Sequence, residues 1–152
     1  MKIHFLFALL CCTLTTSGCT TGDLATKYRP WGMFGGYRDQ LVASNHWIVT
    51  AGTNGVAADG SVQRIALYRA AELAKAAGFN HIQIINQRGE QTLFGVNGES
   101  PTRRSGGSMM IEVIGTNSAA PPTRCLAGSS DQCFTLDVQK TIDEIRPLLN
   151  FG

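Results

Sequence analysis

The chain offers few side-chain combinations that could do chemistry. His46 and His81 are available as bases or ligands, and Arg69 and Glu72 stand three residues apart, the spacing at which two side chains on one helix meet. A hydrolase would need a nucleophile beside a histidine and a carboxylate, but the sequence has neither a Gly-x-Ser-x-Gly elbow nor a His-Glu-x-x-His pair. The sequence therefore predicts no catalytic activity. A hydrolase using His46 or His81 with a nearby carboxylate remains the third alternative.

A second group of residues could bind instead of react. Four large apolar side chains, those of Trp31, Met33, Phe34 and Tyr37, fall within seven residues and must be buried by something. We expect them to cover the core of the domain, with a partner groove or a membrane surface as the alternative. For Arg69 and Glu72 we expect a modest surface pair worth about 0.2 to 0.5 kcal/mol, with a partner-binding pair as the alternative. The candidate ligand or partner contacts are Trp31, Tyr37, His46, Arg69 and Glu72.

The overall composition limits what this chain can be. It has 152 residues, of which 43% are apolar and 16% charged, with a formal net charge of +2. That length suits about one domain and excludes a large multidomain enzyme. A charge so near zero also argues against a dedicated nucleic-acid binder.

The first eighteen residues have the layout of a secretory signal. Lys2 supplies a basic start and residues 5–14 form an apolar run, which is too short to cross a bilayer because about 20 residues are needed. Ser17, Gly18 and Cys19 follow and resemble the lipobox of bacterial lipoproteins, although Thr16 stands where that family usually has an aliphatic residue. An ordinary signal cleaved at an Ala-x-Ala-type site is the alternative.

The lipobox resemblance implies a lipid anchor. The thiol of Cys19 would carry a diacylglycerol and the new amino terminus an acyl chain, and two or three chains hold a protein durably at about 0.8 kcal/mol per buried CH₂. No other cofactor is expected. Thr20 stands where an Asp would retain the protein at the inner membrane, so the resemblance implies a periplasm-facing protein of the outer membrane. Residues 19–27 then form a short lipidated tether, and residues 28–152 form one periplasmic domain.

Removal of the signal leaves three cysteines. With Cys19 lipidated, Cys125 and Cys133 remain as a pair, and in an oxidising periplasm we expect them to close a short disulfide loop. Chain-entropy arithmetic gives this bond about 2 to 3 kcal/mol of stability. A metal-binding or redox pair, the alternative, needs a Cys-x-x-Cys spacing or more ligands than this chain supplies.

The hydrophobic pattern predicts an α+β fold. Residues 39–43 and 46–51 form a predicted hairpin, and residues 61–78 form a predicted helix ending at Gly78, with its inner stripe at Val62, Ala66, Ala70, Leu73 and Ala77. Two further strands are expected at 79–86 and 108–115, with a possible short strand at 92–96, and a last helix at 137–149 capped by Asp137 or Thr135. We expect a two-layer sandwich in which a mainly antiparallel sheet packs against one central helix and a C-terminal helix. Residues 28–37 are expected to form an irregular arm on the core.

Two motifs carry a further resemblance. The chain resembles a family of small, largely uncharacterised lipoproteins of Gram-negative bacteria over residues 28–86. The motifs are Tyr28-x-Pro30-x-Gly32-x-x-Gly35-Gly36-Tyr37-x-Asp39 and Leu67-Tyr68-Arg69-Ala70-Ala71-Glu72-Leu73 with Gly78-Phe79. The resemblance implies a signal-anchored α+β domain and supplies no catalytic residues.

Three functions follow from these expectations. The first is a non-enzymatic envelope lipoprotein that binds another envelope protein or supports outer-membrane integrity. The second is a periplasmic sensor or small-ligand binder with a pocket between sheet and helix, lined by Tyr37, His46 and Glu72. The third is the hydrolase. A closed core with exposed aromatic side chains favours the first, a cavity with convergent polar groups the second, and a Ser, His and carboxylate cluster the third.

Overall fold

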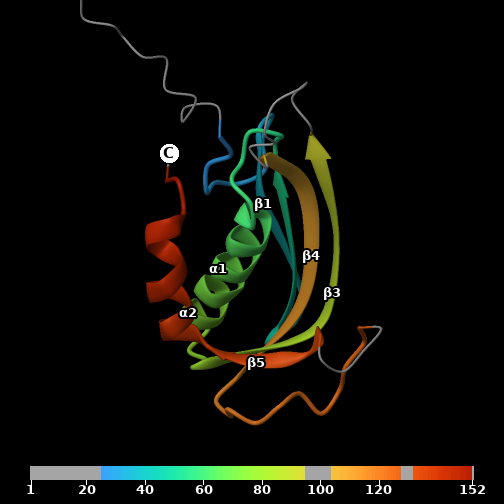
Figure 1. Ribbon diagram of the computed structural model, residues 1–152. Helices are drawn as coiled ribbons and strands as arrows, with labels where there is room; N and C mark the ends of the chain where they lie inside the picture. The colour runs from blue at the N-terminus through green and yellow to red at the C-terminus, as the bar shows by residue number, and fades with distance from the viewer. Residues whose placement is uncertain (1–24, 95–103, 128–131, 152) are drawn as a thin grey trace, which may run out of the picture.

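One antiparallel sheet, covered on one side by two helices, forms the body of the protein (Figure 1). The computed structural model describes residues 25–94, 104–127 and 132–151. The five strands have the order β1-β2-β4-β3-β5, and each pairs antiparallel with its neighbour. This confirms the predicted α+β sandwich with one central and one C-terminal helix.

The strands are longer than the hydrophobic pattern predicts. Their bounds are β1 Gly35–Ala43, β2 His46–Thr53, β3 His81–Phe94, β4 Arg104–Thr116 and β5 Phe134–Asp137. The predicted hairpin is confirmed, with Leu41 paired to Trp47 beside the turn. β3 runs on through Gly89, which pairs with Met109, so the expected end at Asn86 is wrong. β5 was not predicted, because four residues between a disulfide loop and a helix cap give no readable alternation.

Helix α1, Ser61–Ala76, ends as predicted. Gly78 has φ +84°, and the amides of Gly78 and Phe79 donate to the carbonyls of Lys75 and Ala74 at 3.0 and 2.9 Å. This is the Schellman arrangement, which satisfies carbonyls that the helix leaves open. The end of the helix is therefore fixed by its sequence.

The C-terminal helix α2, Val138–Ile145, is shorter than predicted. Asp137 caps it, since its carboxylate accepts from the Lys140 amide at 2.7 Å. A 3₁₀ turn, η3 Arg146–Leu148, follows because Pro147 has no amide hydrogen to continue an α-helix.

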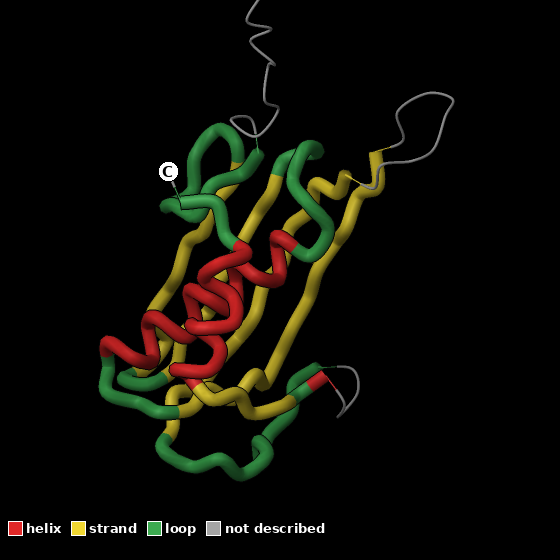
Figure 2. The backbone as a smooth tube through the Cα atoms, turned by 60° about the vertical axis from the view of Figure 1, so that its left-hand side comes forward, coloured by secondary structure: helices red, strands yellow, loops and turns green. Residues whose placement is uncertain are grey.

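The buried side of α1 is broader than the predicted stripe. Ile65, Tyr68, Ala71 and Ala74 are buried in addition to the expected Val62, Ala66 and Ala70, whereas Leu73 is half-buried and Ala77 exposed. The stripe is wide because α1 packs against the sheet on one side and against α2 on the other (Figure 2). Both interfaces need small or aliphatic residues.

The molecule has two distinct ends. We call the end where residue 25 lies the tether end; there β1 and α1 begin, β2 ends and the C-terminal segment finishes (Figure 1). The opposite or far end holds the β1–β2 turn, the end of α1, strand β5 and residues 117–127 (Figure 2). No helix among the described residues is long and apolar enough to span a bilayer. Cys19 and the predicted signal lie outside the described residues.

Candidate functional site

A polar network joins the arm, β1 and α1. Arg69 of α1 donates to Asp39 of β1 through Nε at 2.8 Å and to Glu72, one helical turn away, through Nη1 at 3.3 Å. The hydroxyl of Tyr28, in the arm that precedes β1, donates to the same carboxylate oxygen of Glu72. The Arg69 guanidinium also lies over the ring of Tyr37, 4.7 Å from its centroid. The predicted pair is therefore part of a larger network.

The pKa shifts of Tyr28 and Arg69 keep both groups protonated. Burial raises the pKa of Tyr28, and its hydrogen bond to the Glu72 carboxylate raises it further, so the phenol keeps its proton. Burial alone would lower the pKa of Arg69, but the hydrogen bond and charge of Asp39 outweigh it and the net shift is upward. The network is a neutral donor and a cation held between two carboxylates.

Aromatic rings attach both terminal segments to the same place. The ring of Tyr28 lies 4.7 Å from Tyr37, 4.9 Å from Tyr68 and 5.5 Å from Phe151, measured between centroids. The Tyr28 amide donates to the carbonyl of Asn150 at 2.6 Å. We call this group the terminal cluster; it consists of Tyr28, Tyr37, Asp39, Tyr68, Arg69, Glu72 and Phe151. Its contacts hold the start and the end of the domain together.

His46 lies far from Tyr37 and Glu72. Tyr37 pairs with Ala51, and His46 is about 16 Å from Ala51 along β2 at about 3.3 Å per residue. Strand alternation also turns His46 to the face opposite the buried Trp47. The pocket expected to be lined by Tyr37, His46 and Glu72 therefore does not form.

His46 has a carboxylate partner of its own. Its Nε2 lies 2.8 Å from Oε1 of Glu112, and the other oxygen of Glu112 accepts from the Asn86 amide at 3.4 Å. His81 Nε2 lies 4.0 Å from Asp137, which also caps α2. Each histidine thus has a carboxylate nearby.

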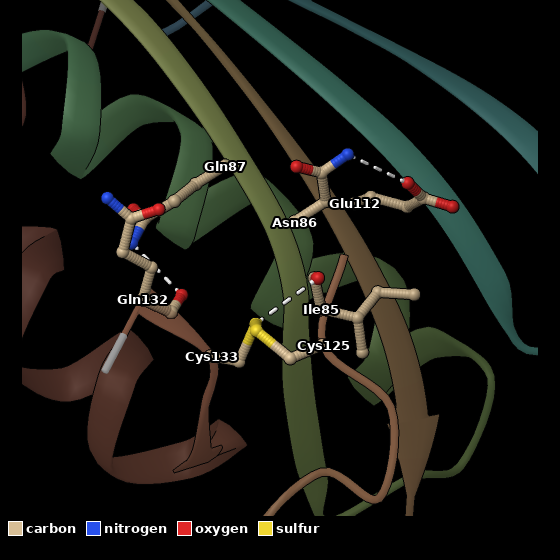
Figure 3. Close-up of a disulfide and its surroundings, with 7 residues drawn as sticks. All are labelled: Ile85, Asn86, Gln87, Glu112, Cys125, Gln132 and Cys133. Atoms are coloured by element: carbon tan, nitrogen blue, oxygen red, sulfur yellow. Dashed lines mark hydrogen bonds between the residues drawn. A yellow bond between two sulfur atoms is a disulfide. The ribbon is translucent and has the colours of Figure 1, made fainter. Parts of the chain in front are cut away.

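Cys125 and Cys133 lie at disulfide distance, as predicted, with their Cα atoms 5.7 Å apart. Figure 3 shows the pair beside Ile85, at the bulge between Ile84 and Asn86 in β3. Cys133 Sγ lies 3.3 Å from the Ile85 carbonyl, which also accepts from the Leu126 amide at 2.7 Å. Ile85 is only 1% exposed although it lies outside the main core cluster. The disulfide segment lies against the backbone of β3 at this bulge.

The arm does not cover the core as expected. Tyr37 packs against the core, but Trp31 is 47%, Met33 92% and Phe34 44% exposed. Trp31 lies across Gly52, where a Cβ would collide with its ring, and Arg38 stacks on it at 5.4 Å. The arm also ends earlier than predicted, because Gly35, at φ +95°, already belongs to β1.

Sequence reasoning missed six residues of these sites, two of which are the rings of Tyr68 and Phe151 in the terminal cluster. Tyr28 and Asp39 are 44 and 30 residues from their partners on α1, while Asn86 and Glu112 meet only across β3 and β4. Strand register could have paired Asn86 with Glu112, since it places directly opposite residues of adjacent strands on one face. It could not have found the contacts of Tyr28 and Asp39, whose partners lie on a helix. No group of three His, Cys, Asp or Glu within the described ranges is placed to hold a metal ion.

Comparisons of the chain with protein-family models, curated proteins and solved structures found no match. The resemblance to Gram-negative lipoproteins therefore stays a prediction, carried by the lipobox-like residues and the two motifs.

Proposed function

We propose that this chain is a lipoprotein of the bacterial envelope. Diacylglycerol and an acyl chain on Cys19 anchor it in the outer membrane, and its periplasmic domain binds another envelope protein without catalysing a reaction. The anchor is supported by the sequence Ser17-Gly18-Cys19 behind a basic start and a short apolar run. The absence of a charge excess, with only two more basic than acidic residues, favours a protein partner over a nucleic acid.

The observation that carries the binding function is the side of the sheet opposite the helices, which we call the open face. Its residues alternate with the buried ones; they are Arg38, Gln40, Ile48, Thr50, Met110, Glu112 and Ile114. Between the arm at one end and residues 117–127 at the other, no described element covers this face (Figure 1). Aliphatic side chains surrounded by charged and amide groups are the usual composition of a protein–protein interface.

Site-specific photocrosslinking in intact cells tests the proposal. A photoreactive side chain at Thr50, in the middle of the open face, should give a crosslinked species of defined mass that contains one other envelope protein. The matched control is Glu144 on α2, whose side chain is 66% exposed on the opposite side of the molecule and should give no such species. Equal crosslinking at both positions, or at neither, would contradict binding by the open face.

Replacement of Cys19 by Ser tests the anchor separately. The variant should be released from the membrane fraction in soluble form, since no helix of the described domain can span a bilayer. The control is Cys125→Ser, which should stay in the membrane fraction. A Cys19→Ser protein that remains membrane-bound would refute the anchor.

One observation favours small-ligand binding as a second function. A hollow of about 440 Å³ lies between α1 and the edge of β3, within the range of ligand sites. Polar side chains from three segments line it, among them Gln63, Arg88 and Gln132, and Gln63 Oε1 is buried with no partner among the described residues. Native mass spectrometry should then find a co-purified polar molecule that is lost in Gln63→Leu. A chain that carries no such molecule would exclude this function.

A further inference from the structure

Exposed apolar side chains gather at the tether end. Trp31, Met33 and Phe34 lie in the arm, while Leu148 and Phe151, 62% and 46% exposed, lie in the C-terminal segment. We call these five residues the apolar tip. The two segments adjoin, because Tyr28 forms a β-bridge with Phe151, and Leu148 lines the same small hollow as residue 25. The tip therefore surrounds the point where the N-terminal segment joins the domain.

The tip is rigidly presented. Thr26, only 6% exposed, donates its hydroxyl to the Phe34 carbonyl at 2.7 Å and accepts from the Asn54 amide at 2.9 Å. The terminal cluster holds Phe151 through Tyr28 and Tyr68. Large apolar side chains thus stay in water although the backbone beneath them is fixed, which is unfavourable unless another apolar phase receives them.

The chain length limits how far this tip can lie from Cys19. Five residues separate Cys19 from Ala25, and six fully extended residue steps span at most about 22 Å. Acyl chains on Cys19 therefore hold Ala25, which lines the same hollow as Leu148 of the tip, within about 22 Å of the bilayer surface. At such a distance even a weak contact forms readily, because the tether gives it a high effective concentration.

The charges at this end suit a phospholipid surface. Lys27 and Arg29 lie in the arm beside the tip, and Arg38 stacks on Trp31. The carboxylates of Asp39 and Glu72 are engaged by Arg69 and Tyr28, while Asp59 is exposed near the start of α1. Tryptophan also favours the membrane interface, where its ring is apolar and its N–H remains hydrated.

We infer that the apolar tip inserts into the interfacial layer of the membrane that anchors Cys19, so that the domain stands on the bilayer with its open face turned to the side. The inference rests on the proposed lipidation of Cys19. The tip contributes a second, non-covalent contact that fixes the orientation of the domain.

Tryptophan quenching by brominated lipid tests the inference. The full lipidated protein is placed in vesicles of phosphatidylethanolamine and phosphatidylglycerol, with and without bromine on the acyl chains. Trp31 should be quenched, while Trp47, 6% exposed in the core, should not. Trp31→Phe keeps the tip apolar and should remove the bromine-dependent signal. A lipidated protein whose tryptophan fluorescence is the same with and without brominated lipid would overturn the inference.

A charge in the tip provides the matched comparison. Met33→Glu should lower the ratio of inserted to free domains about tenfold, because the variant loses about 1.4 kcal/mol of apolar burial in the membrane. Leu41→Glu, at a 61% exposed position toward the far end, should leave the quenching unchanged. Equal loss of quenching in both variants would overturn the inference. A crosslink from position 31 to an envelope protein, together with Trp31 fluorescence that brominated lipid does not quench, would also overturn it.

The outcome for the anchor is read separately from the same preparation. Intact mass reports whether Cys19 carries its acyl chains. Acylated protein without Trp31 quenching refutes the tip contact and leaves the proposed function standing, whereas an unmodified Cys19 refutes the proposed anchor itself.

Discussion

At the two ends of this domain, different kinds of contact hold the irregular segments of the chain against the sheet and helices. At the tether end, hydrogen bonds and stacked rings around Tyr28 hold the two terminal segments to β1 and α1. At the far end, the Cys125–Cys133 disulfide segment lies beside Ile85 at the β3 bulge (Figure 3), and the Leu126 amide donates to the Ile85 carbonyl. The first depends on protonation and the second on oxidation. The ends should therefore respond to different perturbations.

The largest effect should come from removing the ring at the centre of the terminal cluster. Tyr28→Ala deletes three aromatic contacts and leaves the Glu72 carboxylate without its phenol donor. We expect the free energy of unfolding to fall by about 3 kcal/mol in urea titrations. Phe34→Ala, which removes an exposed ring from the same arm, should cost well under about 1 kcal/mol. Similar losses in the two variants would mean that the cluster has no special role.

Reduction of the disulfide should have the next largest effect. A loop of this length contributes about 2 to 3 kcal/mol in the chain-entropy model, so dithiothreitol should lower the urea midpoint. The Cys125→Ser/Cys133→Ser double variant should start at the lower midpoint and not respond to dithiothreitol. A wild-type midpoint insensitive to the reductant would show that the far end does not depend on its covalent bond.

The tether end should also be sensitive to high pH. The pKa of Tyr28 is raised in the folded state, so above about pH 10 the unfolded chain releases a proton that the folded chain keeps. Stability is therefore complete below pH 10 and falls as the pH rises above it. Tyr28→Phe should cost about 1 kcal/mol at pH 7 and reduce the alkaline loss, the remainder being due in part to Tyr68, whose pKa burial also raises. An unchanged alkaline slope in Tyr28→Phe would contradict the hydrogen bond to Glu72.

The smallest effect should come from breaking the His46–Glu112 pair on the open face. Glu112→Gln keeps the size of the side chain and removes the charge facing His46, both side chains being partly exposed at 16% and 20%. We expect a loss of about 0.5 kcal/mol by thermal melting. A loss of several kcal/mol would instead place this pair among the supports of the fold.

The sequence could predict the elements whose signal is local. The end of α1 is predicted by Gly78, and the N-cap of α2 is predicted by Asp137. The β1–β2 hairpin is predicted by the β-branched residues around the Ser44–Asn45 turn. The predicted range of β3 is too short because its polar residues and Gly89 are typical of a loop, although pairing with β4 keeps them extended. Tertiary pairing decided there against local propensity.

The candidate site was harder to predict than the fold. The Arg69–Glu72 spacing was readable on the helix, but Tyr28 and Asp39 reach it only through the arm and the β1 register. His46 was grouped with Tyr37 and Glu72 because a single sequence does not reveal which end of a strand faces which end of a helix. The exposure of Met33 could not be predicted for a related reason. A run of apolar residues predicts burial in the core, but the sequence does not show whether the folded core can contain those side chains.

The central claim is that acyl chains on Cys19 attach this domain to a membrane through its tether end. Tandem mass spectrometry of the amino-terminal peptide from cell envelopes tests it most directly. We expect a chain that begins at Cys19, with diacylglycerol on the sulfur and a fatty acid on the amine. A peptide that begins at another residue, or an unmodified Cys19, would contradict it.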